Sequence, residues 1–559
     1  MATLPEAFTL AQQHYHAGRF HQAEALCRQI LQGQPNHPDV LHLLGVTLHQ
    51  QGKLREAVAQ YLRALALKPA FAEAVNSLGV ALKEQNWLEQ AVARYRHALA
   101  LKPAFAEAYT NLGNALTEQG KLDEGIAQYR HALALKPTDA VAHSNLLLCL
   151  HYHPAYDSAT LFAHHRAWNE QHAGHLTATR VPHRNRRDRE RPLRIGYVSP
   201  DFKRHHGDCL LEPVLTAHDH SQFAVYGYSM VVTADEITRR MQAHADEWRE
   251  IGGMSDDDVA QLIRDDGIDI LVDLSGHTDR NRLLVFARKP APIQAAWVGY
   301  VDTTGLDAMD YRITDRFLSP PDGGQLFTEQ LIHLPGALGY RPPDYAPPVS
   351  PCPAVLGGSL TYGCFNRLAK VHPGVIAIWS KILHRVPTAR VVLKSHALDD
   401  PGTRDRYRML FLEQGIAPER VDLLGWSPHA DMLAQYSRVD IALDPFPFSG
   451  CWTTCEALWM GVPVITLGGA TFVARQGVSL LSQVGSSELI ADSPDHYVDL
   501  AVHLGQDPAR LARLRADLRP RMATSPLCEL TTLVRKLEQA YRTMWRQWCH
   551  GEVRGFRVG

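Results

Sequence analysis

Ser449-Gly-Cys-Trp-Thr-Thr-Cys-Glu-Ala-Leu-Trp-Met-Gly-Val-Pro-Val464 is the stretch that decides the fold of the C-terminal part of the chain. The apolar run Val439–Leu443 before it predicts a buried strand that Asp444-Pro-Phe-Pro447 closes. The apolar run Val462–Leu467 at its far end predicts the next strand. Two buried strands joined by a short helical segment are typical of an α/β sheet.

The turn and helix between these strands predict an anion site. Gly450 permits a tight turn, and Thr453 is placed to cap a short helix over Glu456–Met460 that ends at Gly461. Backbone N–H groups and the helix dipole at such an N-terminus attract phosphate. Glu456 could accept hydrogen bonds from two neighbouring sugar hydroxyls. Thr453-x-x-Glu456 also fits a capping box that needs no ligand, so spacing alone leaves both interpretations open.

The N-terminal part of the chain is repetitive. Gly45, Gly79 and Gly113 recur at a period of 34 residues, and alanine, tyrosine and proline positions recur at matching offsets. This period and pattern are typical of tetratricopeptide repeats, in which helical hairpins stack because none can bury its apolar face alone. Residues 5–37 predict a degenerate leading unit, and residues 140–175 predict further helices that cap the stack.

Between the repeats and the opening stretch, apolar segments again end in polar residues. The predicted strands are 193–202, 268–274, 291–300, 309–315 and 331–334. They alternate with helical stretches, which predicts a doubly wound parallel sheet. Ligands of such sheets bind beyond the carboxyl ends of the strands, and these ends carry His205, Asp273 and His277.

The totals exclude several classes of protein. A chain of 559 residues predicts three or four domains, and a net charge of −2 predicts no nucleic-acid partner and no attraction to acidic membranes. No apolar run reaches about 18 residues, so no membrane-spanning helix is expected. Nine scattered cysteines and the absence of a secretory signal at the start favour a cytoplasmic protein. The basic segment 180–194 lacks interleaved aromatic residues and is interpreted as a solvated linker.

Histidine is abundant, with 30 residues, and pairs such as His151/His153 and His164/His165 raise the question of a metal site. None of the pairs has a His-Glu-x-x-His or Cys/His spacing. The sequence therefore favours solvated or hydrogen-bonded histidines, with no metal and no cofactor.

Several phrases resemble the O-linked N-acetylglucosamine transferases, over nearly the whole chain. They are Gly-Tyr-Val-Ser-Pro-Asp-Phe-x-x-His205, Pro-Ala-Pro-Ile-Gln-Ala-x-Trp-x-Gly-Tyr300, Phe-Asn-x-x-x-Lys370 and the opening stretch. The resemblance implies an all-α tetratricopeptide superhelix followed by a GT-B fold with two Rossmann-like lobes. It places the repeats and their capping helices in 1–180, the N-terminal lobe in 191–340, the interlobe linker in 341–358, and the nucleotide-sugar lobe with a C-terminal helix in 359–559.

The same resemblance implies an inverting, metal-independent enzyme that moves N-acetylglucosamine from UDP to serine or threonine hydroxyls. Protein or peptide acceptors would bind through the repeat superhelix and the interlobe cleft. Lys370 would meet the diphosphate, Glu456 the ribose, and His205 the acceptor as a candidate base, with Asp273 as another. The remaining implied site residues are His277, Gly299, Thr303, Thr304, Asn366, Arg367, Ser427, His429, Gly450, Cys451, Trp452, Thr453 and Thr454.

The chain departs from the family pattern at Arg367, Ala369, Met432, Cys451 and Trp452. Two alternatives stay open, and the departures support the second. One is a catalytically weak, UDP-binding repeat scaffold. The other is a transferase that uses another UDP-sugar or another acceptor.

Overall fold

The computed structural model describes residues 3–205 and 207–551. The chain divides into two compact units, residues 1–142 with 396–407 and residues 143–395 with 408–559. Within the described residues, no helix has both the length and the apolar character needed to cross a bilayer.

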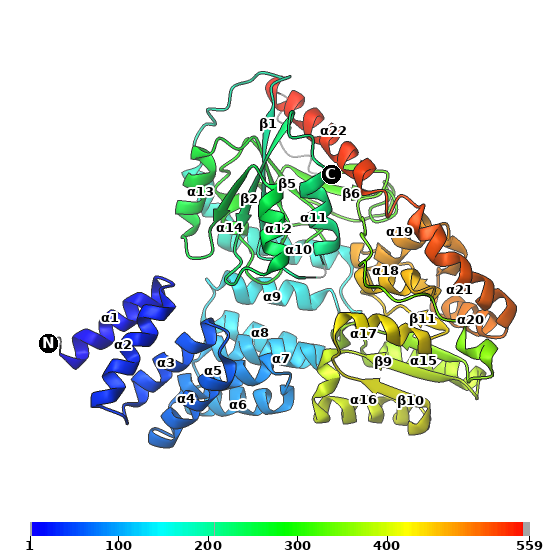
Figure 1. Ribbon diagram of the computed structural model, residues 1–559, viewed down its shortest axis with the longest axis horizontal. Coiled ribbons are helices and arrows are strands. Elements are labelled where there is room, and N and C mark those ends of the chain that lie inside the picture. The colour runs from blue at the N-terminus through cyan, green and yellow to red at the C-terminus, as the bar shows by residue number, and fades with distance from the viewer. Residues whose placement is uncertain (1–2, 206, 552–559) are drawn as a thin grey trace. The chain divides into compact units, whose positions relative to one another are not determined.

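The first unit is built from helical hairpins, coloured blue to cyan in Figure 1. Each hairpin matches one period of the sequence repeat, so the predicted repeats and the degenerate leading unit are confirmed as helix pairs. The helices are α1 (Leu4–His16), α2 (Phe20–Gly33), α3 (Pro38–Gln50), α4 (Leu54–Leu67), α5 (Ala72–Glu84), α6 (Leu88–Leu101), α7 (Ala106–Glu118) and α8 (Leu122–Leu135).

The recurring glycines allow the two helices of a hairpin to pack closely. A Cβ atom on Gly79 would lie 2.6 Å from the ring of Tyr95, and the same contact recurs between Gly45 and Tyr61 at 2.5 Å. The tyrosine rings are fully buried. A period of 34 residues in the sequence is therefore a period of glycine–tyrosine contacts in space.

In the second unit, a seven-stranded parallel sheet follows the helices α9 (Ala140–Leu150) and α10 (Ser158–Trp168) along the chain. Its strand order is β3-β2-β1-β4-β5-β6-β7. The strands are β1 (Leu193–Ser199), β2 (Phe223–Ser229), β3 (Glu247–Glu250), β4 (Ile270–Asp273), β5 (Ile293–Ala296), β6 (Tyr311–Asp315) and β7 (Gln330–Leu334). The connecting helices are α11 (Asp208–Ala217), α12 (Glu236–His244), α13 (Asp256–Asp265) and α14 (Leu283–Ala287).

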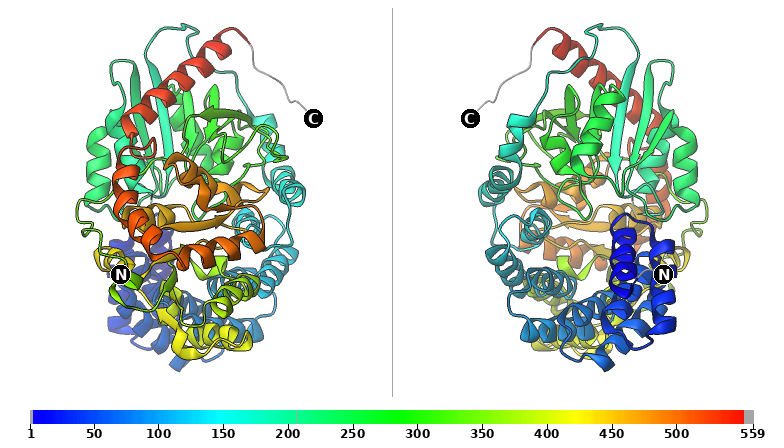
Figure 2. Two further views of the ribbon diagram at one scale, coloured as in Figure 1. Left: turned by 90° about the vertical axis from the view of Figure 1, so that its right-hand side faces the viewer. Right: turned by 90° about the vertical axis from the view of Figure 1, so that its left-hand side faces the viewer.

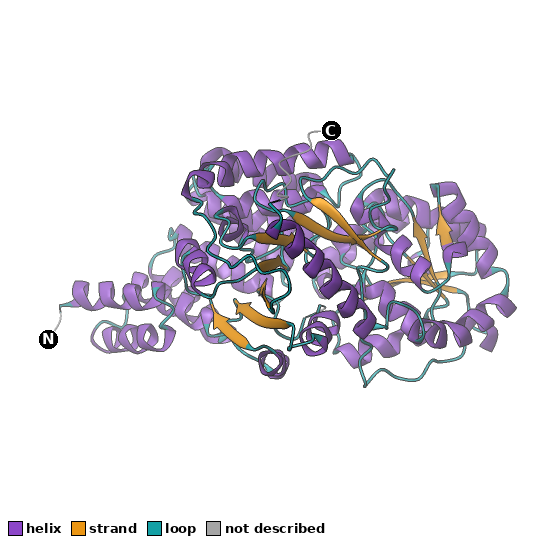
Figure 3. Cartoon of the chain, turned by 90° about the horizontal axis from the view of Figure 1, so that it is seen from above, coloured by secondary structure: helices purple, strands orange, loops and turns teal. Residues whose placement is uncertain are grey.

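A second parallel sheet of six strands follows, in the order β10-β9-β8-β11-β12-β13. Figure 3 shows the strands of the chain gathered in two groups among helices. The strands are β8 (Thr361–Cys364), β9 (Arg390–Lys394), β10 (Val421–Leu424), β11 (Ile441–Leu443), β12 (Val464–Leu467) and β13 (Ile490–Ala491). The helices along this part of the chain are α15 (Pro373–Arg385), α16 (Pro401–Glu413), α17 (His429–Ala434), α18 (Trp452–Trp459), α19 (Gln476–Gln483), α20 (Pro494–Gly505) and α21 (Pro508–Ala523).

The last helix, α22 (Leu530–Cys549), packs on the first sheet rather than on the second. Its apolar side, including Tyr541 and Trp545, belongs to the same buried cluster as Ile195 of β1 and Val272 of β4. Figures 1 and 2 show this red helix lying along the lobe that holds β1. The helix therefore closes the core of the first lobe with residues from the end of the chain.

The basic segment 180–194 is a linker, but it is not freely solvated as its composition predicted. The guanidinium of Arg191 lies 4.6 Å from the centre of the Trp545 ring and donates to Asp269 at 2.7 Å. Arg187 lies over the ring of Trp548 at 4.8 Å. Arg187 and Arg191 thus hold α22 against the linker by cation–π contacts.

The glycine–tyrosine contact predicts the effect of adding one methyl group. Gly79→Ala forces the new Cβ into the Tyr95 ring, and overpacking of this kind costs about 1–3 kcal/mol. The higher helix propensity of alanine offsets about 0.5–1 kcal/mol of this cost. We expect a net fall of several degrees in the first thermal unfolding midpoint, followed by circular dichroism.

Gly33→Ala is the matched control, because no atom lies within 4 Å of a Cβ at the end of α2. Its midpoint should not fall. Equal midpoints for the two variants would contradict the role of the close contact.

Candidate functional site

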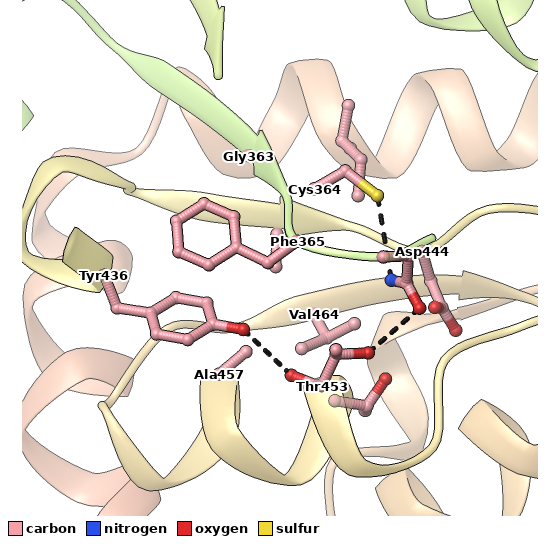
Figure 4. A pocket seen from close by; sticks show the side chains of 12 residues that line it. Gly363, Cys364, Phe365, Tyr436, Asp444, Thr453, Ala457 and Val464 are labelled. Atoms are coloured by element: carbon pink, nitrogen blue, oxygen red, sulfur yellow. Dashed lines mark hydrogen bonds between the residues drawn. The ribbon is translucent and has the colours of Figure 1, made fainter. Parts of the chain in front are cut away.

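Each sheet reverses its strand order at one point, which is where doubly wound sheets bind ligands. In the second lobe this point lies between β8 and β11, which are adjacent strands. A small pocket opens there beyond the carboxyl ends of the strands (Figure 4). Its lining includes Phe365, Asn366, Asp444, Thr453 and Thr454.

Asp444 fixes the turn that follows β11. Its carboxylate accepts hydrogen bonds from the Gly450 backbone N–H at 2.6 Å and from the Thr466 hydroxyl at 2.7 Å. Burial raises the pKa of Asp444 to about 6. A Cβ atom on Gly450 would lie 2.5 Å from the Thr454 hydroxyl and 2.8 Å from Asp444, so only glycine fits this turn.

Helix α18 starts four residues earlier than the sequence predicted. Its N-terminal flanking residue is Cys451, whose side chain makes no capping bond, and Thr453 lies inside the first turn. The hydroxyl of Thr453 donates instead to the side chain of Asn366 at 2.9 Å. The capping box between Thr453 and Glu456 is therefore wrong, because Glu456 is four positions beyond the helix start and both side chains have other partners.

The Lys370 ammonium lies beside the turn that leads into α18. Its Nζ donates to the Ser449 carbonyl at 2.8 Å and lies 4.2 Å from the centre of the Phe448 ring. Burial lowers the pKa of Lys370 to about 8, against the attraction of the Asp444 carboxylate. A desolvated ammonium and a helix N-terminus thus converge on one spot, which suits a polyanion.

Glu456, which lies one turn into α18, forms a pair with His429. The buried Glu456 carboxylate accepts from Nε2 of His429 at 2.8 Å, and Nδ1 of His429 is 2.8 Å from the Tyr345 hydroxyl. The structure thus brings together two of the predicted nucleotide-binding residues from segments 27 positions apart. Ser427, two residues before His429, has a buried hydroxyl that makes no hydrogen bond to the described residues.

Two further predicted residues, His205 of the first lobe and Arg367 of the second, lie near enough for the charge of Arg367 to act on the imidazole. The His205 side chain keeps 37% of its surface exposed. The surrounding protein, followed by the charges of Arg367 and Lys203, lowers the pKa of His205 to about 4. Arg367 is exposed and lies directly before the segment that carries Lys370.

Cys451 and Trp452 occupy the turn itself. Burial raises the pKa of the Cys451 thiol to about 12, so the sulfur stays protonated and neutral near pH 7. Trp452 packs against the core cluster of the first lobe. The Trp452 side chain thus brings the start of α18 into contact with the other lobe.

The other predicted residues of the first lobe are buried. His277 is fully buried, with Nε2 at 2.8 Å from the Thr304 carbonyl and Nδ1 at 3.1 Å from the Ser144 hydroxyl. Thr303 and Thr304 both donate their hydroxyls to Glu329. These bonds hold the loop after β5 in place, and a role in binding or catalysis stays a prediction.

Asp273 and Gly299 stabilise two adjacent strand ends. The carboxylate of Asp273 accepts the backbone N–H groups of Ser275 at 3.1 Å and Gly276 at 2.8 Å, and burial raises its pKa to about 6. A Cβ atom on Gly299 would lie 1.7 Å from the Leu274 carbonyl oxygen. Glycine is therefore required here by the packing of the backbone, and a role of Gly299 in binding stays a prediction.

Comparison with known proteins agrees with this architecture. The family model described as Glycosyl transferase family 41 matches residues 161–339 and 355–537, more than half of the chain. The chain belongs to this family. A TPR repeat model matches residues 45–86, 81–119 and 113–146.

Individual family members are similar over large parts of the chain. An O-GlcNAc transferase mutant from Thermobaculum terrenum superposes with a TM-score of 0.88 and 39% identity, over 92% of this chain and 98% of that one. The probable UDP-N-acetylglucosamine–peptide N-acetylglucosaminyltransferase SPINDLY of Petunia hybrida is 43% identical over 379 residues. That match covers 67% of this chain and 41% of the relative, so the chain spans less than half of its length. The corresponding SEC protein of Arabidopsis thaliana is 32% identical over 374 residues, with 64% and 38% covered.

Sequence reasoning did not single out four site residues of this family 41 chain. Asp444 accepts a hydrogen bond from the turn, and the ring of Phe448 lies beside the Lys370 ammonium. The Tyr345 hydroxyl is within hydrogen-bond distance of His429. The Tyr436 hydroxyl donates to the Thr453 carbonyl at 3.1 Å (Figure 4). An aspartate directly after a buried strand is a signal that could have identified Asp444, whereas the other contacts depend on tertiary structure.

The two predicted histidines of the first lobe should differ in what they contribute to stability. His277→Ala leaves a cavity and removes the partner of the Thr304 carbonyl, which together cost about 2–4 kcal/mol. His205→Ala changes a partly exposed side chain and should cost less than about 1 kcal/mol. Thermal unfolding should therefore separate the two variants, and equal midpoints would contradict the structural role of His277.

Proposed function

We propose that this chain transfers N-acetylglucosamine from UDP-N-acetylglucosamine to serine or threonine hydroxyls of proteins. The reaction would invert the anomeric centre and would need no catalytic metal. The observation that carries the proposal is the position of the Lys370 ammonium beside the N-terminus of α18, at the strand-order reversal of the second lobe. The names of the related transferases support the choice of donor and acceptor.

Lys370 and the first turn of α18 are the groups suited to the leaving UDP. Negative charge develops on the diphosphate as the bond to the sugar breaks. A preorganised ammonium and helix N–H groups stabilise that charge more in the transition state than in the ground state, which is the condition for raising kcat. Loss of one such group typically costs about 10²–10³ in rate. These groups would do the work that a metal ion does in other enzymes.

Glu456 is suited to the ribose. Its carboxylate is buried, and in this structure it accepts a hydrogen bond from His429. Two neighbouring ribose hydroxyls could donate to the same carboxylate, and His429 would then be released toward the base. Ser427, with its buried hydroxyl, is placed in the loop that would contact the base.

His205 is better placed than Asp273 to meet an acceptor hydroxyl. Asp273 is buried and already accepts two backbone N–H groups, whereas His205 is partly exposed and lies within the electrostatic influence of Arg367 in the other lobe. A pKa of about 4 leaves the imidazole of His205 neutral but weakly basic near pH 7. A bound diphosphate would offset the charge of Arg367 and raise this pKa toward the range of an effective base.

Protein acceptors fit the presence of the helical repeats, since such arrays commonly present a concave binding surface. The decisive test of the proposal is a panel of UDP- and GDP-linked sugars with acceptor peptides, read by mass spectrometry. The proposal predicts transfer of N-acetylhexosamine from the UDP donor to serine or threonine. Transfer only from another donor would replace the proposed substrate, and tight UDP binding without turnover would favour a scaffold.

The pKa of Lys370 predicts how UDP binding depends on pH. The ammonium form exists below about pH 8 and is lost as the pH rises through that value. UDP affinity measured by calorimetry should therefore fall between pH 7 and pH 9, by about tenfold per unit at most above pH 8. Lys370→Arg stays charged and should show no such fall. Lys370→Ala should bind more weakly and without this pH dependence.

Lys381→Ala is the control, because Lys381 is exposed and its nearest acid, Asp495, is 3.8 Å away on the surface. It should keep the wild-type pH profile. A wild-type affinity that stays constant from pH 7 to pH 9 would remove Lys370 from the proposed diphosphate site.

A further inference from the structure

Three buried side chains with metal-ligating atoms meet next to the first lobe. They are His151, directly after α9, His165 on α10, and Asp302 in the loop after β5. One ligand atom from each lies within 4.8 Å of the other two. All three residues are more than nine-tenths buried.

His151 has no hydrogen-bond partner for either ring nitrogen among the described residues, although both atoms are buried. Burying a polar group without a partner costs roughly 1–3 kcal/mol, and most buried polar atoms in proteins are therefore paired. Oδ2 of Asp302 lies 3.8 Å from Nε2, which is too long for a hydrogen bond. The buried ring thus has a carboxylate oxygen close by but no bond to it.

His165 is oriented as a ligand. Its Nδ1 lies 2.7 Å from the Leu161 carbonyl, which can only accept, so Nδ1 carries the proton. Nε2 is then the lone-pair nitrogen, which accepts the Tyr300 hydroxyl at 2.8 Å, a bond that a metal ion would replace. A backbone carbonyl that fixes the tautomer in this way is the usual outer-shell partner of a metal-binding histidine.

The charge around these residues favours a cation. Asp302 uses one carboxylate oxygen to accept the Thr303 backbone N–H at 2.8 Å, which leaves Oδ2 for another partner. Three buried carboxylates, those of Glu329, Asp302 and Asp273, act on the buried guanidinium of Arg312.

We propose that His151, His165 and Asp302 bind a structural zinc ion. Two imidazole nitrogens and one carboxylate oxygen are a common zinc donor set, and the Tyr300 oxygen or a water would complete four-coordination. The ligand atoms would close by about an ångström to reach zinc distances of about 2.0–2.2 Å. The ion would tie α10 and the turn after α9 to the loop that carries Thr303 and Thr304. This role is separate from the proposed transfer reaction, which uses no metal.

The test uses the full chain, stripped of metal with a chelator and dialysed. Zn²⁺ is titrated by calorimetry, the bound metal is counted by mass spectrometry, and the thermal unfolding midpoint is recorded with and without Zn²⁺. We expect one Zn²⁺ per chain and a higher midpoint in its presence. Co²⁺ in the same site should give the intense visible bands of a four-coordinate ion. No stoichiometric Zn²⁺ binding, or only the weak bands of six-coordinate Co²⁺, would overturn the proposal.

Variants locate the site. Asp302→Asn keeps the shape of the side chain and the acceptor for Thr303, and His151→Gln keeps a polar side chain of smaller size. Each should weaken Zn²⁺ binding by more than about 100-fold, because loss of even an outer-shell partner typically costs about 10–100-fold. His164→Ala is the matched control, because His164 is the direct neighbour of His165 and lies outside the cluster. Unchanged Zn²⁺ affinity in a folded Asp302→Asn variant, or an equal loss in His164→Ala, would overturn the assignment. A site that prefers Fe²⁺ over Zn²⁺ would overturn the choice of metal.

Discussion

The hydrogen bond from the Gly450 backbone to the Asp444 carboxylate is the contact on which the candidate site depends. It joins the end of β11 to the turn before α18 at 2.6 Å, and no side chain larger than hydrogen fits at Gly450. Burying a carboxylate is costly unless it is paired. Here the Thr466 hydroxyl and the nearby Lys370 ammonium offset that cost, because both lower the pKa of Asp444 against the effect of burial. The buried Asp444 carboxylate thereby stabilises the turn before α18 and attracts the Lys370 ammonium to it.

The fold was largely predictable because it follows local patterns. The 34-residue period gave the helical hairpins, since each repeat places a glycine against a tyrosine ring. The runs at 193–202 and 439–443 were predicted as strands and contain β1 and β11. The edge strand β3 (Glu247–Glu250) was missed because its residues are mostly charged, and β13 was missed because it has only two residues. The packing of α22 on the first sheet has no local signal in the sequence, although the family resemblance implied a C-terminal helix.

The candidate site was predictable in its composition but not in its contacts. A strand, a glycine turn and a helix N-terminus identified the neighbourhood of Gly450. The start of α18 was misplaced because Thr453 and Glu456 fit a capping pattern, whereas Asn366 and His429 from distant segments take their hydrogen bonds. Whether a site residue of the first lobe is buried or exposed depends on tertiary packing. The sequence pattern alone therefore cannot distinguish the buried His277 from the partly exposed His205. The cluster of His151, His165 and Asp302 joins three separate segments, so no spacing rule could reveal it.

The central claim is that the strand-order reversal of the second lobe, between Lys370 and α18, holds a nucleotide diphosphate. The most direct measurement is a crystal structure of the chain with UDP bound. The account predicts the diphosphate at the N-terminus of α18 within hydrogen-bond reach of Lys370, with the ribose on Glu456 and His429 displaced from it. A nucleotide bound in the first lobe, or one that contacts neither Lys370 nor Glu456, would contradict the account.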